Sequence, residues 1–231
     1  MPAVADLAEL AAIPLFAELA ASELGRLNEL LRRRTFPAGA SLMTAEQPGE
    51  VVYVLLDGTA KISVEQADGT EVVLAFLAAG DTVGEMSLFD SAGRSADVVV
   101  VERATCLWLD RAAFHRSLRE MPALGFNLFK LLCRRLRQAN EQLQAIATLD
   151  VEGRVARQLL AFAQQHGRPA PDGGVRIPFK LSQSDLAGLV GASRERVNHA
   201  VADLKERGAI AVQAGPRITV LDAEALAARC R

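Results

Sequence analysis

The stretch that decides the fold is Gly84-Glu85-Met86-Ser87-Leu88-Phe89, followed after a short gap by Arg94-Ser95-Ala96. A glycine lets the backbone approach an anion closely, and neighbouring N–H groups then donate to the anion's oxygens. Arg94 adds a planar, positively charged guanidinium with several N–H donors, and Ser95 can add a hydroxyl donor. The Glu85 carboxylate can accept a hydrogen bond from a ribose 2′-hydroxyl. Together these residue types predict a pocket for a cyclic phosphodiester, whereas a lone Gly-Glu pair is typical of surface turns.

Composition bounds the class of protein. The chain has 231 residues, half of them hydrophobic, which is enough for two domains with separate cores. Its net charge of −2 neither supports nor excludes binding to nucleic acid, so any basic surface must be local.

The cysteines and the N-terminus indicate a compartment. Cys106, Cys133 and Cys230 form no CxxC or Cys/His cluster, which argues against a zinc site and an iron–sulfur cluster. Residues 1–12 include Asp6 and Glu9 and contain no basic start and no long apolar run. We therefore expect a cytoplasmic protein with reduced thiols, without a signal peptide and without a membrane partner.

Residues 35–110 have the pattern of many short strands. Helical spacing precedes them between Leu7 and Arg34 and is broken by Pro14. Turns such as Asp57-Gly58 then separate β-branched runs at 51–56, 60–66, 72–77 and 98–109. This pattern predicts an antiparallel sandwich or barrel that contains the pocket string.

From Gly125 onward the chain predicts one long helix with a heptad seam. Its apolar positions alternate spacings of three and four: Phe129, Leu132, Leu136, Ala139, Leu143 and Ile146. Polar side chains fill the other faces, so the apolar stripe is narrow, as in a two-stranded coiled coil. The stripe predicts a homodimer; an amphipathic helix packed on its own domain is the alternative.

The C-terminal part predicts a winged helix-turn-helix. Ser182-Gln183-Ser184-Asp185 begins one helix, and Gly191-Ala192-Ser193 is a tight turn that caps the next. A turn-rich loop at 167–174 and a strand at 175–179 precede them, and a hairpin wing turns at Ala214-Gly215-Pro216. Candidate DNA-contacting residues lie at the start of the second helix: Ser193, Arg194, Glu195, Arg196, Asn198 and His199.

These segments together resemble the cyclic-AMP receptor protein (Crp/Fnr) family of bacterial transcription regulators. The pocket string matches the phosphate-binding cassette of that family, residues 149–156 match its hinge, and residues 190–195 match the start of its recognition helix. The resemblance implies an α+β fold: an antiparallel, jelly-roll-like β-roll (1–122), a long dimerisation helix with its hinge (123–149) and a winged helix-turn-helix domain (150–231).

The resemblance also implies a function. The protein would be a homodimeric transcription regulator, not an enzyme, with cyclic AMP as its allosteric effector. Its partners would be double-stranded DNA, at palindromic TGTGA-like operators, and RNA polymerase. The implied nucleotide-binding residues are Gly84, Glu85, Met86, Ser87, Arg94, Ser95, Ala96 and Asn140.

Three residues depart from the family's pattern. The adjacent threonine and serine that contact the adenine in the cyclic-AMP receptor align with Ala139 and Asn140, and His199 replaces a second arginine of the recognition helix. Asn140 can still donate to and accept from a purine edge, whereas Ala139 makes no side-chain hydrogen bond. Arg194 and Glu195 match the family and suit guanine and cytosine edges.

Other readings of the chain need residues in particular places. A haem sensor of this fold needs an axial ligand near the pocket, but His115, His166 and His199 lie outside the predicted roll core. A cupin-type metalloenzyme needs several histidines in the barrel, but no histidine precedes His115. An iron–sulfur relative needs an N-terminal cysteine cluster, but Cys106 is the first cysteine. We expect no metal, no haem and no iron–sulfur cluster. Because of Ala139, one alternative function stays open: a regulator of this fold that is ligand-independent or that responds to another nucleotide such as cyclic di-GMP.

Overall fold

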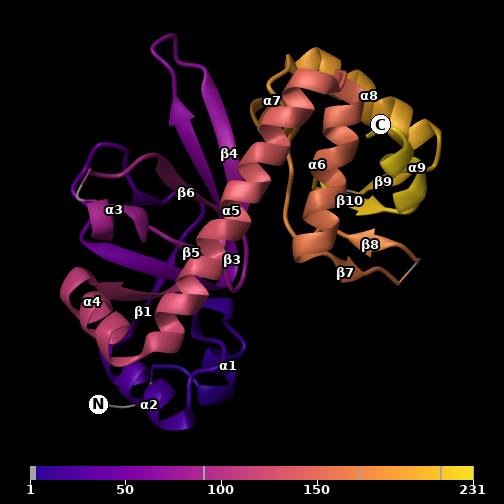
Figure 1. The fold of residues 1–231 in the computed structure, drawn as a ribbon. Helices are drawn as coiled ribbons and strands as arrows, with labels where there is room; N and C mark the ends of the chain where they lie inside the picture. Colours follow the sequence, from indigo (N-terminus) through magenta and orange to yellow (C-terminus); the bar gives the residue numbers. More distant parts are fainter. Residues whose placement is uncertain (1–3, 91, 172, 214, 231) are drawn as a thin grey trace. The chain divides into compact units, whose positions relative to one another are not determined.

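The computed structural model of the protein describes residues 4–90, 92–171, 173–213 and 215–230 (Figure 1). The chain divides into two compact units, one of residues 1–64 with 76–137 and one of residues 65–75 with 138–231. The first unit holds an antiparallel sheet with helices, and the second holds a helix-turn-helix with a small sheet. The predicted α+β class is therefore confirmed.

Short helices open the first unit. They are α1 (Leu7–Ala11), the 3₁₀ turn η1 (Pro14–Phe16) and α2 (Ala21–Leu30), so the predicted break at Pro14 is confirmed. The predicted helical region to Arg34 is too long, because strand β1 begins at Arg32 and pairs with β6. The Arg32 guanidinium lies over the Trp108 ring, 5.3 Å from its centroid, so tertiary contacts override the helix propensity of arginine.

The six-stranded sheet has the order β1-β6-β3-β4, with β2 paired to β6 and β5 paired to β3. The pairings of β6 with β1, β2 and β3, and of β3 with β5, are all antiparallel, as predicted. The strands are β1 (Arg32–Phe36), β2 (Ser41–Met43), β3 (Val51–Glu65), β4 (Glu71–Leu77), β5 (Thr82–Val83) and β6 (Asp97–Asp110).

The predicted turn at Asp57-Gly58 is wrong. Strand β3 runs through both residues, and its register against β6 shifts on either side of Asp57. Gly58 has a φ of 86°, and a Cβ there would come within 2.2 Å of the Arg103 carbonyl oxygen. The glycine therefore serves a β-bulge beside a closely approaching strand and does not reverse the chain.

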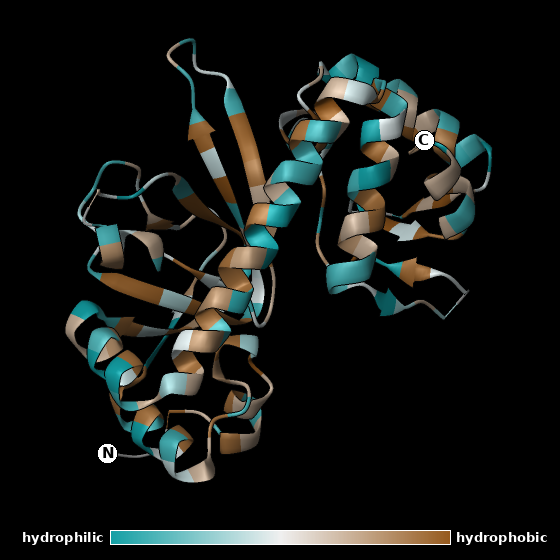
Figure 2. Cartoon of the chain, in the orientation of Figure 1, coloured by the Kyte–Doolittle hydropathy of each residue, from teal (hydrophilic) through white to brown (hydrophobic). Residues whose placement is uncertain are grey.

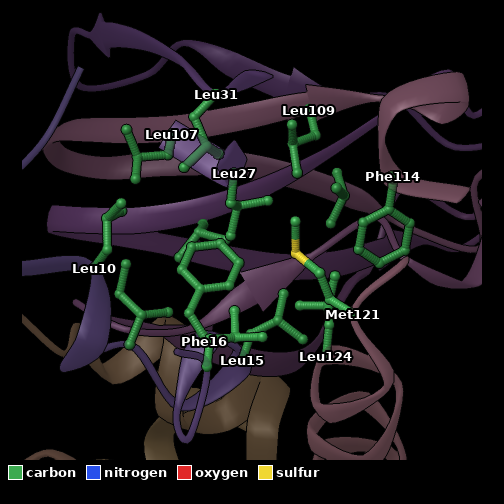
Figure 3. Packing of buried hydrophobic residues seen from close by; sticks show 14 of the residues in the cluster. Leu10, Leu15, Phe16, Leu27, Leu31, Leu107, Leu109, Phe114, Met121 and Leu124 are labelled. Atoms are coloured by element: carbon green, nitrogen blue, oxygen red, sulfur yellow. The ribbon is translucent and has the colours of Figure 1, made fainter. Parts of the chain in front are cut away.

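The core of the first unit lies between its helices and the sheet. Helix α4 (Arg111–Glu120) follows β6 and contributes Phe114, which is fully buried. Figure 3 shows Phe114 near Met121, with Phe16, Leu27 and Leu124 directed into the same cluster. This apolar packing fixes the sheet face and the start of the next helix.

Helix α5 (Pro122–Thr148) is a single helix, as predicted, and begins with a proline at its first position, where no N–H is needed. The division between the two units falls within it, at Arg137. Buried Asn127 donates from Nδ2 to the carbonyl oxygens of Leu15 and Ala17, which fixes the first turns of α5 to the first unit.

The second unit contains α6 (Val151–His166), α7 (Gln183–Val190), α8 (Arg194–Glu206) and α9 (Ala223–Ala228). Its sheet has the order β7-β8-β10-β9, with β7 (Arg168–Pro169), β8 (Val175–Arg176), β9 (Ile210–Gln213) and β10 (Arg217–Val220). The strand predicted at 175–179 ends at Arg176, ahead of Pro178, which lacks an N–H.

The loop predicted at 167–174 begins with strand β7, which pairs with β8. Of the predicted loop and wing turn, Asp172 and Ala214 lie outside the described residues. In the described ranges no helix is both long and apolar enough to span a membrane, and no three His, Cys, Asp or Glu side chains gather to hold a metal ion.

Candidate functional site

The two parts of the pocket string line one pocket in the first unit. Helix α3 (Met86–Asp90) follows β5 directly after Gly84 and Glu85, and the second part of the string leads into β6. The lining residues from the string are Gly84, Glu85, Met86, Ser87, Arg94, Ser95 and Ala96. Apolar and charged side chains complete the lining: Met43, Ile62, Val83, Val98 and Arg135. The structure thus brings together every predicted nucleotide-binding residue except Asn140.

Arg94 lies in the pocket with 8% of its surface exposed. Its Nη1 donates to the Gly84 carbonyl oxygen and to Ser87 Oγ, both at 2.8 Å, and its Nη2 donates to the Val51 carbonyl oxygen at 2.7 Å. These acceptors are neutral. Burial lowers the pKa of the Arg94 guanidinium, because the charged form is desolvated there. A bound anion would compensate this charge.

Two glycines allow this packing. Gly84 has a φ of 91°, and a Cβ there would lie 2.6 Å from Arg94 Nη1 and 2.3 Å from Met43 Cε. A Cβ on Gly49 would lie 1.9 Å from Ser87 Oγ and 3.3 Å from Arg94 Cζ. The sequence pattern identified Gly84 as a pocket residue, but it gave no such role to Gly49.

Glu85 is almost completely buried, with 1% of its surface exposed. Its Oε1 accepts from Arg135 Nη1 at 2.5 Å, and Arg135 also donates to the Thr82 carbonyl oxygen. Its Oε2 is buried and has no hydrogen-bond partner among the described residues. Buried carboxylate oxygens nearly always have a partner, so Oε2 is an acceptor available to a ligand hydroxyl.

Sequence reasoning missed the charged pocket residue Arg135, as well as the apolar lining residues Met43, Ile62, Val83 and Val98. Arg135 is one of several arginines on α5, and nothing in the heptad pattern shows which of them faces the pocket. Its neighbour Arg134 lies 3.8 Å from a carboxylate oxygen of Asp81. The one available signal was chemical: a buried Glu85 needs a cation nearby.

Asn140 does not line this pocket. It is exposed on α5 and belongs to the second unit. Ala139 is also exposed.

The predicted seam lies along α5, where brown and teal bands alternate in Figure 2. Phe129, Leu136, Leu143 and Ile146 expose between 53% and 68% of their surfaces, and Ala139 is exposed too. Leu132 differs, because it is half-buried against the core of the first unit. Phe126, three residues before Phe129, is 69% exposed and extends the stripe. So large an exposed apolar stripe is typical of an interface.

The predicted helix-turn-helix is present in the second unit. Ser182 and Asp185 form a capping box on α7, and Gly191 ends α7 with a φ of 60°. Ser193 caps α8, its side chain accepting from the Arg196 backbone N–H at 3.4 Å. Arg154 on α6 donates from Nη1 to the Gly191 carbonyl oxygen at 3.4 Å. These contacts fix the turn between the two helices.

The start of α8 presents polar side chains. Val197, Ala200, Val201 and Leu204 form its buried face, and the exposed residues are Ser193, Arg194, Glu195, Arg196, Asn198 and His199. Asn198 Oδ1 accepts from Gln183 Nε2 at 2.7 Å, so its side chain is held by α7. The arrangement offers a charged helix start to the solvent, as major-groove readers do.

Comparisons with known proteins define the class. Residues 33–121 match the family model described as "Cyclic nucleotide-binding domain", and residues 153–229 match the "Crp-like helix-turn-helix domain". The protein is thus a transcription regulator that joins a nucleotide-binding module to a DNA-binding one, and it is not an enzyme.

Individual relatives narrow this class. A Mycobacterium tuberculosis protein named "CRP-like cAMP-activated global transcriptional regulator" is 35% identical over 222 residues, covering 96% of this chain and 98% of its own length. The "Cyclic AMP receptor protein" of Thermus thermophilus is 33% identical, with 87% and 90% covered. The structure of FixK2 from Bradyrhizobium japonicum superimposes with a TM-score of 0.77 at 18% identity, with 87% and 98% covered. This chain belongs to the Crp/Fnr family of regulators, whose members bind DNA as dimers.

Proposed function

We propose that this protein is a cyclic-AMP-responsive homodimeric regulator that binds palindromic TGTGA-like operators. The observation that carries the proposal is the pair of buried charges in the pocket: Arg94, bonded to neutral acceptors, and Glu85, which has one unused oxygen. A cyclic phosphate beside a ribose 2′-hydroxyl supplies the anion and the donor that these two groups lack. The relatives named as cyclic-AMP-activated or as a cyclic AMP receptor protein favour adenine as the base.

Different pocket residues would bind different parts of the nucleotide. Arg94 would bind the phosphate with Ser95 beside it, and Glu85 would accept from the 2′-hydroxyl through Oε2 while Arg135 holds Oε1. Met43, Ile62 and Val98 provide an apolar wall for the flat base. Asn140 would read the purine edge in the liganded dimer.

Ligand binding would act on DNA affinity through a shift of population. A ligand favours the conformation to which it binds more tightly. It can change the DNA affinity by no more than the difference between its binding free energies for the two conformations. In the active dimer the two α8 helices would face successive major grooves about 34 Å apart. Arg194 would pair with guanine O6 and N7, and Glu195 would accept from cytosine N4. RNA polymerase would be the further partner at promoters.

The test is fluorescence anisotropy of a labelled duplex with two TGTGA half-sites, at one fixed salt concentration, with and without cyclic AMP. Tightening by about tenfold or more, equivalent to about 1.4 kcal/mol of coupling, supports the proposal. Arg94→Leu should lose this response and keep the fold, while the exposed Arg116→Leu on α4 should respond normally.

Two results would contradict the proposal. A normal response in Arg94→Leu would refute the pocket assignment. DNA binding that cyclic AMP does not change in the wild-type protein would refute cyclic AMP as the effector. The second result would favour the alternative left by Ala139, a regulator that is ligand-independent or that responds to another nucleotide such as cyclic di-GMP.

A further inference from the structure

Three backbone carbonyls converge behind the pocket on one arginine that does not line it. Arg111, the first residue of α4, donates from Nη2 to the carbonyl oxygens of Gly49 at 2.9 Å and Ser87 at 2.8 Å. Its Nη1 lies 3.3 Å from the carbonyl oxygen of Leu88. The guanidinium therefore joins the loop before β3 to helix α3.

A second side chain of α4 reaches the same helix. His115 Nε2 lies 2.8 Å from the Leu88 carbonyl oxygen, and its ring packs edge-on against Phe89, with centroids 5.4 Å apart. Helix α3 has five residues, so its last carbonyls find few partners within the helix. Arg111 and His115 supply those partners.

Arg111 is itself held firmly. Its backbone N–H donates to the Glu50 carbonyl oxygen at 2.9 Å, and Glu50 Oε2 lies 3.8 Å from its Nε. The preceding residue, Asp110, caps α4 by accepting from the Ala113 N–H at 2.8 Å. The guanidinium thus extends from a fixed point where β6 ends and α4 begins.

The groups that Arg111 holds are those that position the pocket arginine. Ser87 Oγ accepts from Arg94 Nη1, and Gly49 packs so closely that a Cβ there would overlap Ser87 Oγ. A shift of the backbone at Gly49 or at Ser87 would move Ser87 Oγ, the oxygen that fixes the Arg94 guanidinium. A displacement of about 1 Å in a positioned polar group is enough to cost much of its effect.

We propose that Arg111, assisted by His115, is a positioning residue for the phosphate half of the nucleotide: it holds Gly49 and α3 where Arg94 can bind an anion. This inference rests on the nucleotide pocket proposed above. Arg111 itself makes no contact with the ligand. Replacing Arg111 should therefore weaken binding of ligands with a charged phosphate and leave recognition of the 2′-hydroxyl unchanged.

The first experiment compares two ligands by calorimetry in wild-type protein and in Arg111→Met. Cyclic AMP should bind the variant about tenfold more weakly or worse, because charge-assisted hydrogen bonds are its strongest contacts. A neutral methyl triester of cyclic AMP should lose less than about twofold, because it lacks the charge that Arg94 meets. Arg116→Met, an exposed arginine of the same helix, should change neither affinity.

The second experiment needs no ligand. Amide hydrogen exchange of residues 87–90 should be faster in Arg111→Met than in wild-type protein, by a larger factor than the change in the global free energy of unfolding explains. If Arg111→Met does not fold, Arg111→Lys replaces it: a lysine reaches one carbonyl in place of three, so a loss of affinity for cyclic AMP is again expected, with the affinity for the neutral triester little changed.

Equal losses for the charged and the neutral ligand, or unchanged exchange at residues 87–90, would overturn the role of Arg111. A wild-type protein that binds neither ligand would instead count against cyclic AMP as the effector, while the exchange measurement still decides whether Arg111 holds α3.

Discussion

Replacing Glu85 by glutamine tests whether the pocket recognises a ribose hydroxyl through this side chain. Glu85 Oε1 is occupied by Arg135 at 2.5 Å, and Oε2 is buried without a partner among the described residues. A ligand hydroxyl would therefore meet Oε2. In Glu85→Gln the Arg135 guanidinium should attract the amide oxygen, which turns the amide NH₂ toward the ligand, where it can donate to the hydroxyl.

The size of the effect follows from the charge. A hydrogen bond to a charged group contributes about 1.5–3 kcal/mol, and one between neutral groups about 0.5–1.5 kcal/mol. Removing the 2′-hydroxyl from cyclic AMP should thus weaken binding to wild-type protein roughly 10- to 150-fold. The same removal should weaken binding to Glu85→Gln only about 2- to 10-fold.

Calorimetry on the four combinations of two proteins and two ligands gives this difference directly. Glu29→Gln, an exposed glutamate on α2, is the matched control and should behave as wild type. Circular dichroism establishes that Glu85→Gln is folded. If the 2′-deoxy ligand is weakened by the same factor in both proteins, Glu85 does not read the hydroxyl, and the reasoning from its unused oxygen is wrong.

Three further results are expected. Arg194→Ala should lose roughly 1–3 kcal/mol of discrimination at one guanine, measured by anisotropy on operator variants; equal weakening on every sequence would make Arg194 a phosphate contact. Leu136→Glu, at a position 64% exposed in the single chain, should keep the fold and raise the dimer dissociation constant by about tenfold or more, because it would bury two like charges. Sedimentation velocity checks this, and an unchanged dimer would place the interface elsewhere. Burial raises the pKa of Cys106 to about 12, so at mildly alkaline pH iodoacetamide should label exposed Cys133 and not Cys106. Peptide mapping decides this last point, and labelling of Cys106 in the native protein would contradict its burial.

The sequence predicted the elements that local chemistry specifies. The pocket string carries its own glycine, anion donor and acceptor, and the helix-turn-helix carries its caps at Ser182 and Ser193 and its turn glycine at Gly191. Each of these needs only residues near it in the chain, so a linear pattern is sufficient.

The errors arose where a distant segment decides the outcome. Asp57-Gly58 has the composition of a turn, but strand β6 pairs on both sides of it and makes it a bulge. Arg135 and Arg111 are ordinary surface arginines in the sequence, and only the folded chain brings them to Glu85 and to the carbonyls of α3. No periodicity marks such residues, because their partners lie 50 and 24 positions away.

The two pocket glycines also bear on how this binding site can diversify. Any side chain at Gly84 or Gly49 would overlap Arg94 or Ser87, so single substitutions there should be removed by selection whatever nucleotide is used. The part of the proposed site that would bind phosphate therefore tolerates no single substitution at these two glycines. New effector preferences would have to arise through other lining side chains such as Ile62 and Val98, because Met43 itself packs against Gly84, where a Cβ would lie 2.3 Å from Met43 Cε.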